Sequence, residues 1–262
     1  MSRAQAERYK ACFDLLRANL FPDGSDPDLR WWRFRRPALE LQAAIQDMDS
    51  VLTCAIVTKH LSFSVVPREY IMSKNTIVFK TNNWAVFACL QSSMHEIWSR
   101  EYSSTLETRL NYSPTDCFET FPFPCHFERL DSVGSVFYDY RKVVMLAEQQ
   151  GLTKTYNRFH SPDDREAAMI NLRRLHVEMD QAVAAAYNWQ DLNLGHSFHE
   201  TKQGIRYTIS ESARREVLDR LLTLNHQRNA DEEAEAKANP IAAPAKRGRK
   251  PRDAGGQIAM DL

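Results

Sequence analysis

The sequence has little glycine and no closely paired cysteines, and both shortages limit the sites that it can build. Eight glycines are scattered through 262 residues, whereas a phosphate or dinucleotide cradle needs several of them in one turn. The absence of a Cys-x-x-Cys pair argues against a zinc module and against disulfides. We therefore expect no metal site and five small, mostly buried hydrophobic residues. These are Cys12, Cys54, Cys89, Cys117 and Cys125.

Long apolar runs are also missing. The longest lies near Val51–Val57 and is far too short to cross a bilayer. The first twenty residues carry five charged side chains between Arg3 and Asp14, which argues against a signal peptide. The composition, with 43% hydrophobic and 26% charged residues, is typical of a soluble globular protein. We expect a cytoplasmic protein with no membrane partner. Because its net charge is zero, nucleic-acid binding would depend on where basic residues cluster.

The segment Trp84–Pro124 organises the predicted fold. Apolar residues recur in its first half at three- and four-residue steps, which predicts a buried amphipathic helix. They are Val86, Phe87, Leu90, Met94, Ile97 and Trp98. The residues off this stripe, expected on a solvated face, are Gln91, Ser92, His95 and Arg100. The second half breaks at Asn111–Pro114 and ends in Phe121–Pro124, where prolines exclude helix. We expect a short strand followed by a stiff aromatic-proline strap.

The remaining sequence predicts strands first and helices later. Runs rich in β-branched and aromatic residues predict strands at Val51–Thr58, Leu61–Val66 and Thr76–Lys80. Helical spacing predicts a helix over 1–21, with Tyr9, Phe13, Leu16 and Leu20 on one face, and further helices at Ala38–Met48, Ser132–Gln150, Ser161–Trp189 and Ser210–Arg228. Ser161 is the expected N-cap of the fourth helix, and Leu152–Phe159 the expected polar connector before it.

These elements predict an α+β fold: a small mixed sheet with packed helices, followed by a helical C-terminal part and a disordered tail. The expected divisions are a first domain at 1–128, a helical domain at 129–229 and a basic tail at 230–262, where large apolar residues become rare.

Basic residues cluster near the N-terminus, on the predicted sheet loops and in the tail. Arg33, Arg35 and Arg36 alternate with aromatic residues, as on surfaces that bind phosphates; alternatively, Trp31 and Trp32 are core anchors and the arginines solvate their flank. The loop candidates for DNA contacts are Lys59, His60, Arg68, Lys74, Asn82 and Arg109, and the weaker ones are Gln91 and His95. In the tail, Lys246, Arg247 and Arg249 lie in a cluster similar to an AT-hook, with one extra lysine.

Several stretches resemble one enzyme family. The runs LQSSMHEIW and SSTLETRLNYSPTDCFETFPFP, with RWWRFRRP, TKHLSF, TKTYNRF and LRRLHVEMDQAVAAAYNW, resemble the C-terminal specificity region of single-chain, adenine-specific DNA methyltransferases of bacterial restriction–modification and phage defence. The resemblance extends from about Tyr9 to Arg228. It implies a target recognition domain and a helical C-terminal part, which in the family follow an N-terminal methyltransferase domain.

The chemistry of that family has no counterpart among these residues. Its S-adenosylmethionine pocket needs a glycine-rich turn, and its base-binding loop has an Asn/Asp-Pro-Pro-Tyr/Phe pattern, whereas Asp26–Pro27 is followed by neither a second proline nor an aromatic residue. Pro22–Asp23 has no suitably placed nuclease partner either. We therefore assign no catalytic residue and expect S-adenosylmethionine on a partner or on a missing N-terminal domain.

Two functions remain open. The first is a DNA-sequence-recognition module, with double-stranded DNA and a methyltransferase catalytic domain or subunit as partners. The second is an assembly subunit of a defence complex, in which Trp31, Trp32 and the Phe121–Pro124 strap form a partner surface. The C-terminal Gln257, Ile258, Met260 and Leu262 resemble the hexapeptide by which bacterial DNA-processing proteins bind the sliding clamp.

Overall fold

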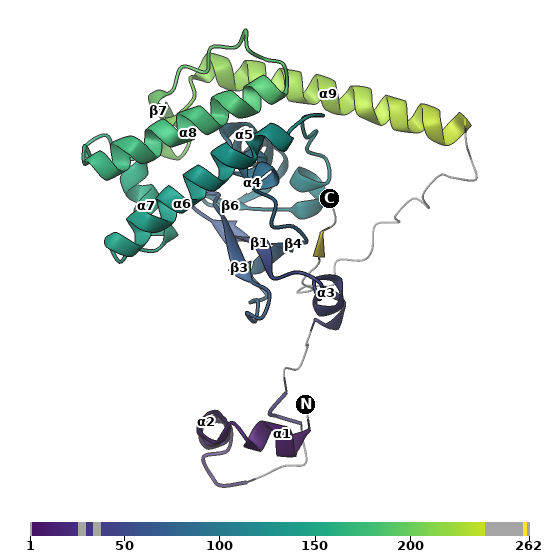
Figure 1. Cartoon of the computed structure of the whole chain (residues 1–262), viewed down its shortest axis with the longest axis vertical. Coiled ribbons are helices and arrows are strands. Elements are labelled where there is room, and N and C mark those ends of the chain that lie inside the picture. The colour runs from purple at the N-terminus through teal and green to yellow at the C-terminus, as the bar shows by residue number, and fades with distance from the viewer. Residues whose placement is uncertain (1, 26–29, 34–37, 239–258, 261–262) are drawn as a thin grey trace. The chain divides into compact units, whose positions relative to one another are not determined.

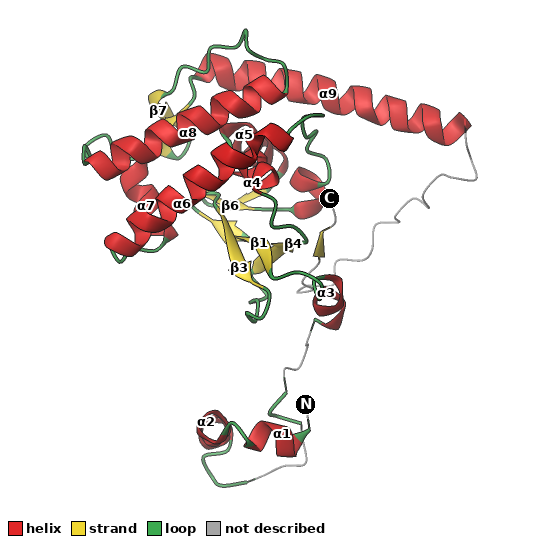
Figure 2. Ribbon diagram, viewed as in Figure 1, coloured by secondary structure: helices red, strands yellow, loops and turns green. Residues whose placement is uncertain are grey.

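The computed structural model describes residues 2–25, 30–33, 38–238 and 259–260 (Figures 1 and 2). The helices are α1 (Arg3–Glu7), α2 (Lys10–Leu20), α3 (Leu39–Ala44), α4 (Trp84–Gln91), α5 (Ser93–Tyr102), α6 (Asp131–Ala147), α7 (Leu152–Phe159), α8 (Ala167–Ala186) and α9 (Glu211–Ala238), with short turns η1 (Pro114–Phe118) and η2 (Glu128–Leu130). The strands are β1 (Ser50–Ala55), β2 (Val57–Thr58), β3 (Phe63–Pro67), β4 (Thr76–Phe79), β5 (Ser104–Leu106), β6 (Arg109–Asn111), β7 (Ser197–Thr201), β8 (Gly204–Thr208) and β9 (Ala259–Met260). The predicted α+β class is confirmed.

The chain divides into two compact units, Met1–Ala43 and Ala44–Leu262. The first contains α1 and α2 where one helix was predicted, because the backbone of Tyr9 (φ −92°, ψ 57°) is not helical. Phe13 is buried, but Tyr9, Leu16 and Leu20 are 69%, 47% and 51% exposed. The prediction that all four lie on one face of a single helix is wrong, because the helix is interrupted at Tyr9.

The main sheet of the second unit is built around β1. Strands β3 and β4 pair antiparallel with its two edges, and the short β9 pairs parallel with β4. All three predicted strand regions are confirmed, but the predicted strand at Val51–Thr58 is interrupted at Ile56. The N–H of Ile56 donates to Asn75 (2.9 Å) and its carbonyl accepts from Tyr112 (2.7 Å). The chain passes there from the main sheet to a second, β2-β6-β5 sheet.

The central helix of the prediction is two helices, α4 and α5, that meet at Ser92. Ser92 has an extended backbone (ψ 159°), and its hydroxyl donates to the carbonyl of Cys89 at 2.7 Å. The N-terminus of α5 is covered by a carboxylate, because Oδ1 of the buried Asp180 accepts from the N–H of Ser93 at 2.8 Å. A negative charge at this end of a helix is stabilising.

The expectation that Gln91, Ser92 and His95 face solvent is wrong, since each is at most 5% exposed. Gln91 Oε1 accepts from the N–H of Phe63 (3.1 Å) and from the buried Arg141 (3.0 Å). The side-chain oxygen of Gln91 is therefore satisfied inside the protein. The sheet and the later helices cover α4 and α5 from both sides (Figure 2).

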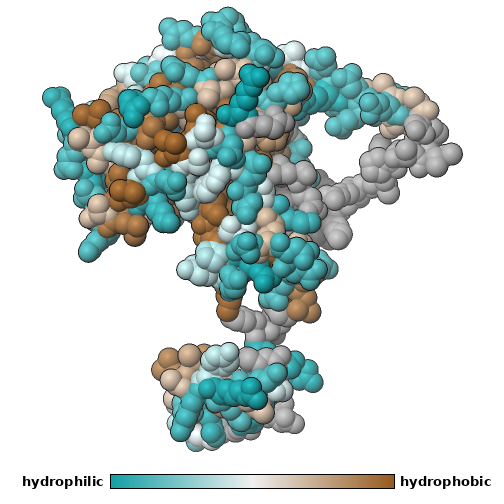
Figure 3. All heavy atoms as spheres, viewed as in Figure 1, coloured by the Kyte–Doolittle hydropathy of each residue, from teal (hydrophilic) through white to brown (hydrophobic). Residues whose placement is uncertain are grey.

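The outer layer consists of α6, α8 and α9, which pack over α4 and α5. Gly134 of α6 has a steric role, because a Cβ at this position would lie 2.2 Å from the backbone oxygen of Trp84. Only glycine permits α6 to lie so close to α4. On its other side α6 leaves Val136, Val143 and Leu146 exposed by 53%, 62% and 68%, and Figure 3 shows hydrophobic side chains in this region.

The segment before α8 differs from its prediction. Leu152–Phe159 is the helix α7 instead of a connector, and the next helix begins at Ala167 instead of Ser161. The guanidinium of Arg173 donates to the backbone carbonyls of Phe159 (2.8 Å), Ser161 (3.0 Å) and Asp164 (2.8 Å). In a helix starting at Ser161, carbonyls of this segment would instead accept from backbone N–H groups. The predicted N-cap role of Ser161 is therefore wrong.

The C-terminal part is helical as predicted, with two differences. A hairpin, β7–β8, precedes α9, and α9 continues to Ala238, so the predicted tail begins as helix at residues 230–238. No helix in the described part of the chain is long and apolar enough to cross a membrane.

Candidate nucleic-acid interface

The register of the main sheet separates the predicted DNA-contacting residues into two groups. Arg68 follows Pro67, which lies opposite Ser50 at the start of β1. Asn82 is at the same end, since its side-chain amide lies 3.4 Å from the hydroxyl of Ser50. Arg68 is already engaged there. Its guanidinium donates to the carbonyl of Gln46 at 2.5 Å and lies 3.7 Å from the carboxylate of Glu69.

The other group lies toward the end of β1. Thr58 pairs with Leu110, so Lys59 and Arg109 flank the same end of the β2–β6 ladder. Lys74 precedes Thr76, which pairs with Ala55. Lys59, Lys74 and Arg109 are exposed, and Lys154 in the first turn of α7 adds a fourth cation. We call these four residues, which come from the ends of the two sheets and from α7, the basic end.

A single duplex that touched both groups would have to run along β1, whose six residues span about 20 Å.

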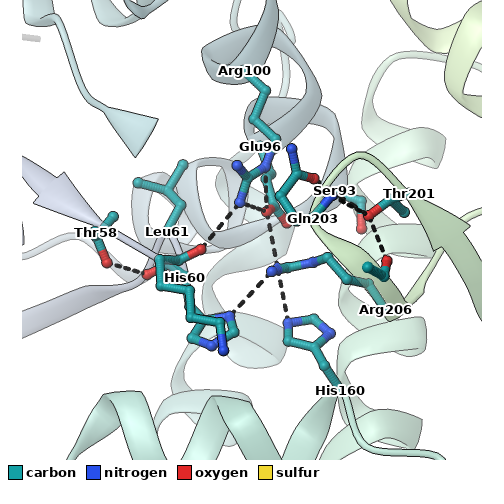
Figure 4. A network of polar contacts seen from close by, with 12 residues as sticks. Thr58, His60, Leu61, Ser93, Glu96, Arg100, His160, Thr201, Gln203 and Arg206 are labelled. Atoms are coloured by element: carbon teal, nitrogen blue, oxygen red, sulfur yellow. Dashed lines mark hydrogen bonds and ion pairs between the residues drawn. The ribbon is translucent and has the colours of Figure 1, made fainter. Parts of the chain in front are cut away.

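His60 lies beside the basic end but below the surface, and it is 5% exposed. Its Nε2 lies 3.0 Å from Oδ1 of Asn157, and its Nδ1 lies 3.1 Å from the guanidinium of Arg206. The same guanidinium reaches Nε2 of His160 (2.9 Å) and Oε1 of Glu96 (3.1 Å). Figure 4 shows these side chains converging from the β2–β3 turn, α5, β8 and the end of α7.

The protonation of this network follows from its geometry. A guanidinium can only donate, so the two histidine nitrogens that face Arg206 must carry lone pairs. Burial favours this neutral form, because it lowers the pKa of His60 to about 4 and that of His160 to about 2. Burial alone would raise the pKa of Glu96, but Arg206 and Arg100 lower it below its ordinary value. Arg206 therefore has one charged and two neutral acceptors.

The network also fixes part of the basic end. Oδ1 of Asn157 accepts from His60 and from Nζ of Lys59, which lies 2.8 Å away. Arg100 donates to the carbonyl of Lys59 (3.4 Å). The position of Lys59 is therefore set by Arg100 of α5 and Asn157 of α7. The sequence analysis did not identify Glu96, Asn157, His160 or Arg206. The one local signal is that Arg206 and Thr208 alternate with the exposed Ile205 on β8 and face inward.

The remaining predicted contacts are less informative. His95 is buried, with its Nε2 2.9 Å from the hydroxyl of Tyr112. Trp31 packs on Phe13 with ring centroids 4.6 Å apart, which favours the core-anchor alternative for this tryptophan. Arg33 is exposed.

The other predicted contacts fall largely outside the described residues. Those outside are Arg35, Arg36, Lys246, Arg247, Arg249, Gln257, Ile258 and Leu262. Met260 is in β9, where it pairs with Phe79.

The strap at Phe121–Pro124 is not the partner surface that the second hypothesis required. Phe121, Pro122 and Pro124 are buried, and the carbonyl of Pro122 accepts from the hydroxyl of Tyr187 at 2.9 Å. That part of the hypothesis is wrong. Within the described residues no group of three or more His, Cys, Asp or Glu side chains could hold a metal ion.

Comparisons with known proteins identify the sheet region. Residues 49–125 match the family model described as "MmeI, target recognition domain". This span contains β1 to β6, α4, α5 and the strap, and it confirms the target recognition region that the sequence resemblance indicated.

Among solved structures, the chain is similar to the type IIL restriction–modification enzyme MmeI in complex with DNA. The sequence identity is 17% and the TM-score 0.48, over 69% of this chain and 21% of that protein. The chain thus spans about a fifth of that enzyme's length. A search of the curated proteins found no match.

The buried histidines predict a loss of stability at mildly acidic pH. Burial lowers the pKa of His60 to about 4 and that of His95 to about 3, so both rings stay neutral in the folded protein at pH 5. In the unfolded chain each takes up a proton below its ordinary pKa of about 6.5. Stability is therefore fully present above about pH 6.5 and falls as the pH drops toward 4, by about 2 kcal/mol per ring at pH 5. Urea unfolding at pH 7 and pH 5 measures this loss.

The variant His60→Gln should reduce the difference between the two pH values, whereas His226→Gln, at an exposed site on α9, should leave it unchanged. Equal unfolding free energies of the wild-type protein at pH 7 and pH 5 would contradict the neutral, buried network.

Proposed function

We propose that this chain recognises a DNA sequence on behalf of an adenine-specific restriction–modification or phage-defence methyltransferase. The observation that carries the proposal is that the target-recognition match at 49–125 coincides with the strands that position Lys59, Lys74 and Arg109. A rigid sheet can hold side chains in position to contact DNA, and these side chains can differ without changing the fold. A role in restriction would place the protein in the bacterial cytoplasm.

The candidate residues suit two kinds of contact, with phosphates and with bases. The lysines of the basic end suit phosphates, which give affinity without sequence information. Arg109 lies on the short β5–β6 hairpin, its side chain 47% exposed and 3.2 Å from Glu107. A two-stranded ribbon fits the major groove, where arginine binds guanine through two hydrogen bonds. Asn82 could bind adenine in the same manner.

Methyl transfer would be carried out elsewhere. In this proposal a methyltransferase domain or subunit holds S-adenosylmethionine and flips the target adenine, while this chain holds the duplex. The support is the sequence: the glycine-rich turn and the Asn/Asp-Pro-Pro-Tyr/Phe loop have no counterpart in its 262 residues.

A second function, an assembly subunit without direct DNA readout, is favoured by a single observation. The outer side of α6 exposes Val136, Val143 and Leu146, and exposed apolar side chains gathered on one helix occur at partner surfaces. Such a surface would bind protein with little dependence on salt. The salt dependence of duplex binding therefore separates the two functions.

The C-terminus adds a possible partner, a bacterial sliding clamp. The support is the pattern of Gln257, Ile258, Met260 and Leu262, in which a glutamine is followed by apolar residues that could enter a pocket. Burial of each apolar side chain would contribute about 1.5–3 kcal/mol before ordering costs. Because Met260 is paired with β4 through its backbone, clamp binding would require this short strand to separate.

The basic end predicts a salt-dependent affinity for duplex DNA. Lys74→Ala and Lys154→Ala should each weaken binding to all duplexes and reduce the slope of log affinity against log salt by about one contact. Fluorescence anisotropy with a pool of random-sequence duplexes at several salt concentrations measures both effects. Lys237→Ala, at an exposed position near the end of α9, is the control. A salt slope near zero for the wild-type protein would favour the assembly function.

The isolated chain should neither bind S-adenosylmethionine nor transfer its methyl group, because the motifs that hold the cofactor and the flipped adenine are missing. Calorimetric titration with the cofactor and an assay with labelled cofactor and duplex DNA measure these two properties. Stoichiometric cofactor binding would refute the division of labour proposed above.

A labelled peptide of residues 255–262 should bind a bacterial sliding clamp with micromolar affinity at best, since a free peptide loses conformational entropy on binding. Fluorescence polarisation measures the affinity, and Gln257→Ala and Leu262→Ala peptides should bind more weakly. Equal signals for the three peptides, or none, would rule out the clamp as a specific partner.

A further inference from the structure

A depression of about 260 Å³ lies on the sheet near the basic end. Six of its ten lining residues carry a hydroxyl group. They are Thr53, Thr58, Ser62, Ser64, Thr76 and Thr153. Five come from the strands and turns of the sheet and one from the first turn of α7, so segments distant in the sequence close around one space.

The strand register explains why these hydroxyls share a face. Thr53 lies opposite Ser64 in the β1–β3 ladder, and Ala55 lies opposite Thr76 in the β1–β4 ladder. Side chains at alternate positions point to the same side of a sheet. Leu52 and Cys54, which point to the other side, belong to the hydrophobic core. One face of this part of the sheet is therefore apolar and closed, and the other carries hydroxyls.

Most of the hydroxyls are available to a ligand. Thr53 donates to the carbonyl of Ser64 (3.0 Å), and Thr58 donates to that of His60 (2.7 Å). The hydroxyls of the other four have no hydrogen-bond partner within the described part of the chain. They belong to Ser62, Ser64, Thr76 and Thr153. A hydroxyl can both donate and accept, so these four form a neutral polar surface.

Three lysines lie within two residues of the depression's lining in the sequence. Lys59 follows Thr58, Lys154 follows Thr153, and Lys74 is two residues before Thr76. Lys59 is held in place by Asn157. A hydroxyl-lined floor bordered by lysines matches a sugar–phosphate chain, whose oxygens accept from hydroxyls and whose charge attracts lysines. A solvated strand face also tends to carry threonine, but the wall contributed by α7 makes this face concave.

We propose that this depression holds the sugar–phosphate backbone of one strand of the bound DNA through neutral hydroxyl donors, with the lysines on its border. The proposal rests on the DNA-recognition function and goes further, because it assigns Ser64 and Thr76, which carry no charge, to the interface. These contacts give affinity without sequence preference.

The test compares hydroxyl variants with charge variants. Thr76→Val and Ser64→Ala remove hydroxyls that have no partner in the described protein and change the side-chain volume little. Each should lower affinity for a pool of random-sequence duplexes by about fivefold, the equivalent of one hydrogen bond. The slope of log affinity against log salt should stay unchanged, because no counterion release is lost. Lys74→Ala should reduce that slope.

Ser132→Ala, at an exposed position on α6 where the hydroxyl has no partner in the described protein, is the matched control, and urea unfolding verifies that each variant is folded. Unchanged affinity in both folded hydroxyl variants, together with a reduced slope in Lys74→Ala, would overturn this inference and leave the recognition function standing. A loss confined to a selected target sequence would also overturn it, since the hydroxyls would then contact bases. No salt-dependent binding by the wild-type protein would overturn both.

Discussion

The buried guanidinium of Arg206 is the interaction on which the arrangement of the second unit depends. It joins β8 to α5 through Glu96. It also joins β8 to His60 in the β2–β3 turn and to His160 directly after α7. Placing a cation away from water is costly unless each donor finds an acceptor. Because these acceptors lie between 46 and 146 residues before Arg206 in the sequence, they satisfy Arg206 only when the sheet and the helical part are assembled together.

This dependence links the sheet region to the helical C-terminal part, which the sequence predicted as separate domains. The target-recognition match ends at residue 125, yet Glu96 inside the match needs Arg206 outside it. Asn157, also outside, orients both His60 and Lys59. The geometry of the candidate interface is therefore partly determined by the helical C-terminal part. That part supplies the α7 wall of the hydroxyl-lined depression as well.

Local patterns were sufficient for some of this structure. The three strand regions and the proline-rich strap were predicted because each depends on backbone preferences of neighbouring residues. Gln91 and His95 were placed on the wrong side of their helix, because a polar residue can be buried when a distant group such as Arg141 or Tyr112 satisfies it. Ser161 failed as an N-cap for a similar reason, since Arg173 bonds the carbonyls around it. Lys59 and Arg109 were identified individually, but only the strand register places them at the same end of the β2–β6 ladder. Of the partners of Arg206, only His60 was singled out from the sequence.

The extension of α9 to Ala238 bears on how a duplex could approach. Its final turns carry Asp231, Glu232, Glu233 and Glu235 against a single lysine, all exposed. Phosphates would be repelled along this arm within roughly 8–10 Å at moderate ionic strength. An acidic arm on the same unit as the basic end makes the protein electrostatically polar, so a passing duplex experiences a torque before any contact forms. Such a field would select productive orientations during the encounter and raise the association rate without adding to the bound interface.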